Sequence, residues 1–168
     1  IPDIALRRRI GYVIQDGGLF PHLTVEENIS LLLETVGMPS EKIPARVDEV
    51  LEMVNLDPDT FRNSFPAQLS GGMQQRAAIA RALAYEPTFI MMDEPFAALD
   101  YFTREQMQKE LLRVQQERSA SILFVTHSID EALILGSQIA VIEKGMVKAL
   151  YEVKAPQEER NLLEDEMI

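Results

Sequence analysis

The chain has 168 residues, which is enough for one compact domain with a hydrophobic core. Its 27 acidic and 16 basic residues give a net charge of −11. This charge argues against duplex nucleic acid as the main partner, because that affinity depends on clustered Lys and Arg. The absence of cysteine excludes disulfides, thiolate metal sites and a thiol nucleophile, and no apolar run approaches the roughly 20 residues of a membrane-spanning helix.

A short strand is predicted over residues 10–14, which read I-G-Y-V-I. It ends in Gln15, and the following D-G-G-L-F-P-H is rich in residues that favour turns. Gln15 is therefore expected at a strand end, where a flexible loop begins.

Residues 24–87 are predicted to be helical, with no strand among them. Thr24 and Glu27 have the spacing of a capping box at the start of the first helix. A second helix is expected over 40–55 and a loop over 64–69. Because strands are predicted before and after this stretch, we expect a helical insertion between two strands of one sheet.

The segment L-S-G-G-M-Q-Q at 69–75 leads into a further helix, expected to run to Pro87. Ser70 is a favourable N-cap residue, and Gly71 and Gly72 leave the backbone amides of the helix start open to an approaching anion. Taken alone, the same pattern also fits a plain helix cap.

The apolar run F-I-M-M at 89–92 predicts a strand buried on both faces of a parallel sheet. It ends in two adjacent carboxylates, Asp93 and Glu94, and Pro95 stops the strand. Open α/β sheets bind their ligands at the carboxyl ends of the strands. The pair therefore marks a candidate site, with a solvated acidic turn as the alternative.

Asp100 is expected to cap a long helix that ends near Arg118. Residues 122–125 form a second predicted buried strand, which ends in Thr126 and His127. His127 is thus a third polar group at a strand end.

Ser128 and Glu131 have capping-box spacing and begin a short helix to residue 135. Strands over 139–142 and 146–151 are separated by Lys144-Gly145, so the sheet is expected to finish in a hairpin. A charged tail is expected over 152–168.

The order of these segments resembles the nucleotide-binding subunit of an ATP-binding-cassette (ABC) transporter over essentially the whole chain. Two local sequences are most similar to importers of compatible solutes such as glycine betaine and other quaternary amines, or of nitrate and sulfonates. They are G-L-F-P-H-L-T-V-E-E-N-I and M-D-E-P-F-A-A-L-D. The matching motifs are the Q-loop (Gln15), the signature (69–75), the Walker B strand (89–95), the D-loop (A-A-L-D, 97–100) and the switch histidine (Thr126-His127).

Two departures from the family pattern stand out. Met73 occupies a signature position that most often holds Gln. No G-x-x-x-x-G-K-[ST] occurs in the chain, so we expect the phosphate-binding Walker A loop, and the aromatic residue that stacks on adenine, to precede residue 1.

The resemblance implies one partial ABC ATPase domain over 1–168, with the amino-terminal portion missing. Its fold class is α/β, a P-loop NTPase (RecA-like) core with a mainly parallel sheet. The core portion comprises 1–23 and 88–151, the helical signature subdomain 24–87, and the charged tail 152–168.

The resemblance also implies ATP and Mg²⁺ as cofactors. Asp93 would hold Mg²⁺ through water, and Glu94 would orient and polarise the attacking water. His127 would contact the γ-phosphate, and Gln15 would sense the metal and the water.

The signature residues are expected to act on another subunit's ATP. In the family, two subunits face each other head to tail. Ser70, Gly71, Gly72 and Gln75 would then contact the nucleotide bound by the partner, and Asp100 would lie at the interface.

The helical insertion and the Gln15 loop would receive a coupling helix from a transmembrane permease. The protein would then lie at the cytoplasmic face of the membrane, with a solute-binding protein as an indirect partner. A soluble ABC ATPase acting on DNA or ribosomes is an alternative that long coiled-coil insertions or a basic face would favour. A non-catalytic binding module is another, because the phosphate loop is absent from the 168 residues.

Overall fold

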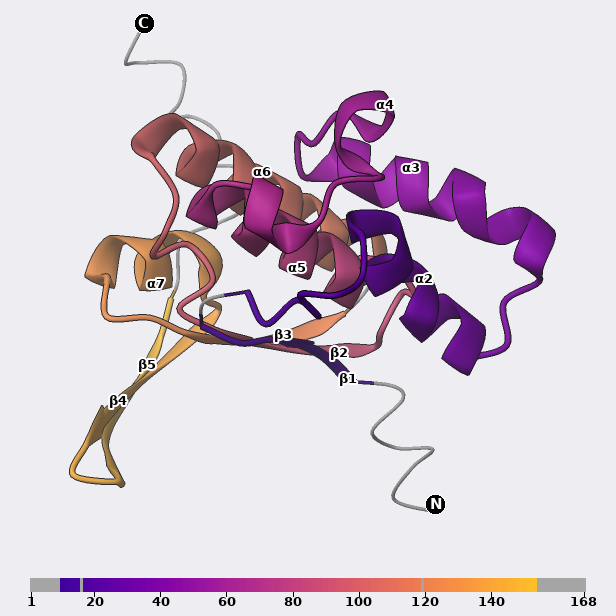
Figure 1. Ribbon diagram of the computed structural model, residues 1–168. Helices are drawn as coiled ribbons and strands as arrows, with labels where there is room; N and C mark the ends of the chain where they lie inside the picture. Colours follow the sequence, from indigo (N-terminus) through magenta and orange to yellow (C-terminus); the bar gives the residue numbers. More distant parts are fainter. Residues whose placement is uncertain (1–9, 16, 119, 154–168) are drawn as a thin grey trace, which may run out of the picture. The chain divides into compact units, whose positions relative to one another are not determined.

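A computed structural model describes residues 10–15, 17–118 and 120–153 (Figure 1). The chain divides into two compact units, Ile1–Val125 and Thr126–Ile168. The charged tail expected over 152–168 lies, from residue 154 onward, outside the described residues.

A three-stranded parallel sheet forms the base of the first unit. Its strands are β1 (Ile10–Val13), β2 (Phe89–Asp93) and β3 (Ser121–Val125), in the order β1-β2-β3. The whole helical stretch therefore separates β1 from its neighbour β2. Because both pairs are parallel, the residues that follow the three strands emerge at one edge of the sheet, where ligands of such folds bind.

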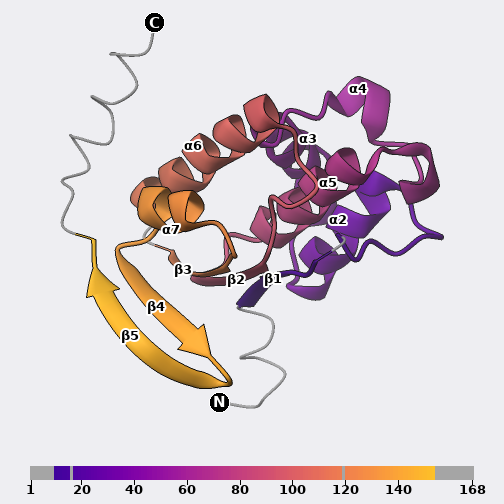
Figure 2. The same cartoon turned by 90° about the vertical axis from the view of Figure 1, so that its left-hand side faces the viewer.

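The helices of this unit lie on one side of the sheet in both views (Figures 1 and 2). None of the described helices is long and apolar enough to cross a membrane. The prediction that the stretch between β1 and β2 contains helices and no strand is confirmed for its described residues. The elements are α2 (Val25–Thr35), η1 (Ser40–Lys42), α3 (Ile43–Met53), α4 (Pro58–Phe61), η2 (Pro66–Gln68), α5 (Gly71–Leu83) and, after β2, α6 (Tyr101–Arg118).

Three boundaries in the helical stretch differ from the sequence prediction. The helix expected to run to Pro87 ends at Leu83. Ser40 opens a short 3₁₀ turn, and the second α-helix begins only at Ile43. Pro44 accounts for this start, because proline lacks an N–H and fits only the first turn of an α-helix. The segment expected as a loop over 64–69 contains the 3₁₀ turn η2.

The expected burial of β2 on both faces is correct for one face only. Ile90 and Met92 are 0% and 1% exposed, whereas Phe89 and Met91 are half-buried. The alternation arises because successive side chains of a strand point to opposite faces, and the described helices of this unit cover one of them.

The second predicted buried strand, β3, shows the same pattern more strongly. Leu123 and Val125 are 47% and 49% exposed. Ile122 and Phe124, which point the other way, are half-buried. An unbroken apolar run thus predicted the strand correctly but overstated its burial.

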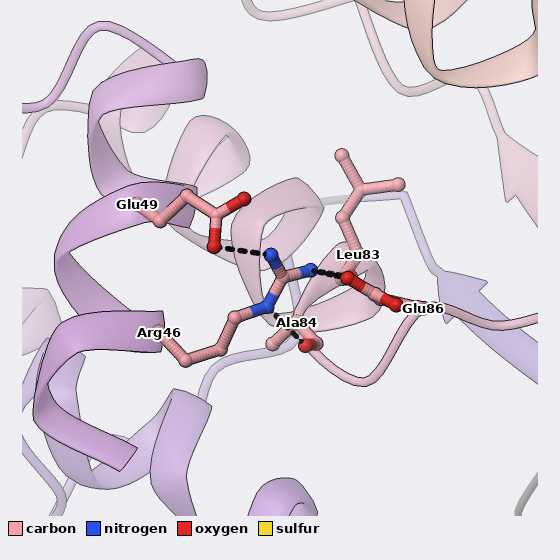
Figure 3. Close-up of polar contacts among 5 residues, drawn as sticks. All are labelled: Arg46, Glu49, Leu83, Ala84 and Glu86. Carbon is pink, nitrogen blue, oxygen red and sulfur yellow. Dashed lines mark hydrogen bonds and ion pairs between the residues drawn. The ribbon is translucent and has the colours of Figure 1, made fainter. Parts of the chain in front are cut away.

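Arg46 on α3 makes a buried connection to the end of α5. Its side chain is 8% exposed, and it donates hydrogen bonds to the carbonyl oxygens of Ala84 (2.6 Å) and Leu83 (3.1 Å). The guanidinium also pairs with Glu49 at 2.6 Å and with Glu86 at 3.5 Å (Figure 3). These contacts satisfy carbonyls that the helix itself leaves without a partner.

The second unit contains α7 (Ile129–Leu135) and the antiparallel strands β4 (Gln138–Glu143) and β5 (Met146–Glu152). The predicted hairpin is confirmed. Its turn residues Lys144 and Gly145 both have positive φ, 51° and 75°, as in the tight turns that suit the twist of hairpins. Among the described residues the hairpin forms a two-stranded sheet of its own and does not extend the parallel sheet.

Candidate functional site

Gln15 and Glu94 meet at the carboxyl edge of the parallel sheet. The Gln15 Nε2 donates to the Glu94 Oε2 at 3.4 Å, across a separation of 79 residues. Glu94 has a left-handed backbone with φ of 45°, and its N–H donates to the carbonyl of Val125 at 2.9 Å. This bond anchors the turn after β2 to β3. A non-glycine residue held in that conformation is typical of functional sites.

Asp93 is the last residue of β2, half-buried and in register with Val125 of β3. It lies directly before Glu94, so two carboxylates follow each other where the strand ends. Carboxylate and amide oxygens are the donors that Mg²⁺ prefers, and this ion usually takes one or two carboxylates together with phosphate and water. Asp93, with Glu94 and Gln15 beside it, therefore has the chemistry to hold a magnesium ion.

The start of α5 is exposed and consists of small residues. Ser70 has the extended backbone of an N-cap, and its hydroxyl accepts a hydrogen bond from the Met73 N–H at 3.3 Å. A Cβ on Gly71 would meet no atom within 4 Å. A Cβ on Gly72 would lie 3.1 Å from the Ala98 carbonyl oxygen. The structure thus brings the signature segment against the A-A-L-D segment of the same chain.

The charge at the start of α5 differs from that at the starts of α2, α6 and α7, and resembles α3 in having no acidic residue in the first turn. Two acidic residues lie in the first turn of α2 and two in that of α7, and Asp100 caps α6. The first turn of α5 has none, and its cap Ser70 is neutral. Because helix amino termini carry a partial positive charge, this end of α5 remains suited to an anion, even in an acidic chain.

Gln75 does not lie at this exposed helix start. Its side chain is 2% exposed, and its Nε2 has no hydrogen-bond partner in the part of the chain that the structure describes. A Cβ on Gly17 would lie 3.6 Å from the Gln75 Oε1. The structure therefore places Gln75 against the loop that follows Gln15, away from Ser70 and Gly71.

Asp100 caps α6 as predicted. Its Oδ1 accepts from the Thr103 N–H at 3.0 Å, and its Oδ2 accepts from the Thr103 hydroxyl at 2.7 Å. These two hydrogen bonds hold the pKa of the Asp100 carboxyl below its ordinary value. The side chain is exposed at the surface that adjoins the signature segment.

His127 belongs to the second unit, whereas Gln15 and Glu94 belong to the first. The Ser128 hydroxyl accepts from the Glu131 N–H at 3.4 Å, which is the N-cap half of the predicted capping box. The other half differs: the Ser128 N–H donates to the Thr126 hydroxyl oxygen at 3.0 Å, and that hydroxyl donates to the Glu131 carboxylate at 2.5 Å. Thr126 therefore joins the cap and fixes the backbone on both sides of His127.

Asn28 is a residue of the site region that the sequence analysis missed. Its buried amide accepts from the Phe20 N–H at 2.8 Å. It donates to the carbonyls of Phe20 (3.2 Å), Leu23 (3.1 Å) and Thr24 (2.8 Å). A polar residue within the apolar stripe of α2 was the available signal, because a buried amide needs such partners.

Comparisons with known proteins agree with this geometry. A family model described as "ABC transporter" matches residues 2–97. The chain is 46% identical over 144 residues to the glycine betaine/carnitine/choline transport ATP-binding protein OpuCA of Bacillus subtilis (strain 168), covering 86% of this chain and 38% of the relative. It is 44% identical over 144 residues to the osmoprotectant import ATP-binding protein OsmV of Salmonella typhimurium, with the same coverage of 86% and 38%.

A third relative is the spermidine/putrescine import ATP-binding protein PotA of Pseudomonas fluorescens, 48% identical over 141 residues, or 84% of this chain and 38% of the relative. The chain thus spans about 38% of the length of these curated relatives. Among solved structures, the dimeric post-hydrolysis state of the ATP-binding cassette MJ0796, bound to ADP and Pi, matches with a TM-score of 0.84 and 36% identity, over 92% of this chain and 69% of that chain.

The predicted fold class, an α/β core with a parallel sheet and a helical insertion, is confirmed by the strand order and by this structural neighbour. The resemblance to ATP-binding subunits of compatible-solute importers agrees with the names of the relatives. The family match covers more than half of the chain. The chain therefore belongs to the ABC transporter family.

Proposed function

We propose that this chain is part of the energy-coupling ATPase subunit of an importer for compatible solutes, with quaternary amines as the substrate class. One observation carries the enzymatic half of the proposal: Gln15 and Glu94, 79 residues apart, meet beside Asp93 at the ligand-binding edge of the sheet. The substrate class is supported by the relatives named for glycine betaine, choline and osmoprotectants. The solute itself would be selected by the membrane and binding subunits.

In the proposed reaction, water attacks the γ-phosphate of ATP. Bound Mg²⁺ would neutralise charge that develops on the phosphate oxygens. Asp93 would hold that ion through water, and Glu94 would orient and polarise the attacking water. The Gln15 amide nitrogen donates to Glu94, and its amide oxygen would be available to the metal and the water. His127 would contact the γ-phosphate.

The helix start at Ser70, Gly71 and Gly72 would act on ATP bound by a second subunit. Its exposed backbone amides and uncharged cap are chemically suited to that task. A head-to-tail dimer, with Asp100 at its interface, is supported by the dimeric state named for the structural neighbour. ATP binding would close the dimer and hydrolysis would reopen it, which drives the transporter between two states.

The parts of the domain follow from the same proposal. Residues 1–23 and 88–151 would belong to the catalytic core, and 24–87 to the helical signature subdomain. The loop after Gln15 and the helical subdomain would receive a transmembrane permease at the cytoplasmic face of the membrane, with a solute-binding protein as a further partner. Asn28 hydrogen-bonds the backbone of the described part of this loop at Phe20 and Leu23, which supports its use as a docking surface.

Glu94→Gln tests the catalytic assignment in the complete gene product, because phosphate binding also needs a glycine-rich loop that the 168 residues do not contain. We expect ATP affinity to be kept and turnover to fall by at least about 100-fold. Phosphate release and equilibrium nucleotide binding measure the two quantities. Glu105→Gln, on the exposed surface of α6, is the matched control and should turn over normally. Parental turnover by Glu94→Gln would refute the role of Glu94.

Coupling to transport is tested separately. The complete protein and its permease, reconstituted in vesicles, should take up glycine betaine only with ATP, and Glu94→Gln should abolish this uptake. An active ATPase that the permease neither binds nor stimulates would favour the soluble ABC ATPase instead.

A further inference from the structure

Arg81 on α5 hydrogen-bonds the backbone at the start of the loop that follows Gln15. Its Nη1 donates to the Gly18 carbonyl oxygen at 3.0 Å, and its Nη2 donates to the Gly17 carbonyl oxygen at 3.4 Å. Both glycines have positive φ, 77° and 56°, a backbone conformation that other residues rarely adopt. Two donors on one planar group, each meeting a neighbouring carbonyl, hold the loop in position and in orientation.

The loop lies directly against the backbone of α5. A Cβ on Gly17 would come within 3.3 Å of the Gln74 carbonyl oxygen, which is tighter than ordinary contacts. The Arg81 guanidinium also lies 5.9 Å from the centre of the Phe20 ring, within the range of a cation–π interaction. Burial lowers the pKa of Arg81, which agrees with a guanidinium partly withdrawn from water.

The far end of the loop is held by a different helix. Asn28 of α2 binds the backbone of Phe20, Leu23 and Thr24. Arg81 therefore holds the end of the loop that adjoins Gln15, and Gln15 in turn contacts Glu94. Ser70 lies eleven residues before Arg81 on the same helix, roughly 16 Å along its axis. One rigid helix thus joins the signature end to the Gln15 end.

We propose that Arg81 is a positioning residue that fixes the loop after Gln15 on α5, so that the loop and α5 move as one body. When α5 shifts on meeting a phosphate at its amino terminus, the loop shifts with it, and the bond between Gln15 and Glu94 is remade or broken. This inference rests on the proposed function for its consequence in transport. The attachment of the loop to α5 rests only on the contacts of Arg81.

The test compares Arg81→Met with Arg46→Met in the complete protein. Each arginine donates to two backbone carbonyls. Arg81 bonds those of Gly17 and Gly18 in the loop, whereas Arg46 bonds those of Leu83 and Ala84 at the end of α5. Hydrogen exchange of the loop amides is measured without nucleotide and with MgATP. In Arg81→Met, we expect faster loop exchange and no loop response to MgATP, while the response at the start of α5 persists. Arg46→Met should leave loop exchange and its response at parental levels.

Transport provides the second measurement. With glycine betaine as the probe, uptake per ATP hydrolysed should fall by about fivefold in Arg81→Met and stay parental in Arg46→Met. Arg81→Lys keeps the charge but loses the planar fork, and should give an intermediate ratio. Equal changes in Arg81→Met and Arg46→Met would overturn the proposal, as would a loop that still follows α5 in Arg81→Met. If the parent protein does not transport, the proposed function fails, and the exchange measured without nucleotide still tests the attachment of the loop to α5.

Discussion

The two ends of helix α5 differ in burial and in the partners of their backbone groups. At the amino end, Ser70 and Gly71 are exposed and carry no charge. At the carboxyl end, the buried guanidinium of Arg46 bonds the carbonyls of Leu83 and Ala84 and pairs with two carboxylates.

The difference follows from what a helix leaves unsatisfied. Its last carbonyls lack partners within the helix, and where they are buried a cation is the most favourable partner. Its first N–H groups also lack partners, but at an exposed end water can satisfy them until an anion arrives. Helix α5 is thus anchored at one end and left open at the other, which is consistent with the phosphate contact proposed for its open end.

Gly71→Asp should have the largest effect, because it closes the open end. A carboxylate repels phosphate there, and we expect turnover of the complete protein to fall by at least about 100-fold. Stability should not fall, since an acidic residue in the first turn favours the helix by about 0.3–1 kcal/mol. Phosphate release and urea denaturation measure both. Gly71→Ala, whose Cβ meets nothing within 4 Å, is the control. Parental turnover in Gly71→Asp would show that the amino end of α5 does not bind an anion during turnover.

Arg46→Met should affect stability and not turnover. It keeps the aliphatic packing but leaves the carbonyls of Leu83 and Ala84 without their donor, at a cost of about 3 kcal/mol. Urea denaturation measures this loss, and phosphate release per folded molecule should remain parental. Glu49→Gln is the control, because that carboxylate is 51% exposed and its pairing is worth under about 1 kcal/mol. A loss in Arg46→Met no greater than in Glu49→Gln would show that the anchor is unimportant.

The smallest expected effect is on the pH dependence of stability, which should differ between the charged cap of α6 and the neutral cap of α5. Because the pKa of Asp100 is lowered in the folded state, its stabilising contribution is present above the ordinary value of 3.8 and is lost as pH falls through the folded pKa. Parent and Asp100→Asn should therefore differ in urea midpoint at pH 7 and converge in acid below the ordinary value. Ser70→Ala, at the neutral cap, should lower stability by about 1 kcal/mol at every pH. A pH-independent difference for Asp100→Asn would contradict this assignment.

The sequence by itself determined the features that depend on neighbouring residues. Thr24 with Glu27, Ser70 with Met73, and Asp100 with Thr103 form caps between residues three apart, so their spacing is enough to predict them. The ordered motifs determined the family in the same way, because their residue types and spacing are read directly along the chain.

Only the tertiary structure decided which distant groups meet and which apolar faces are covered. Gln15 reaches Glu94, Arg46 reaches Ala84 and Arg81 reaches Gly18 across 79, 38 and 63 residues. It also showed that β3, apolar from Ile122 to Val125, is covered by the described helices of its unit on one face only. The physical reason is that caps and strands are set by local backbone geometry, whereas long-range contacts and burial depend on how the whole chain packs.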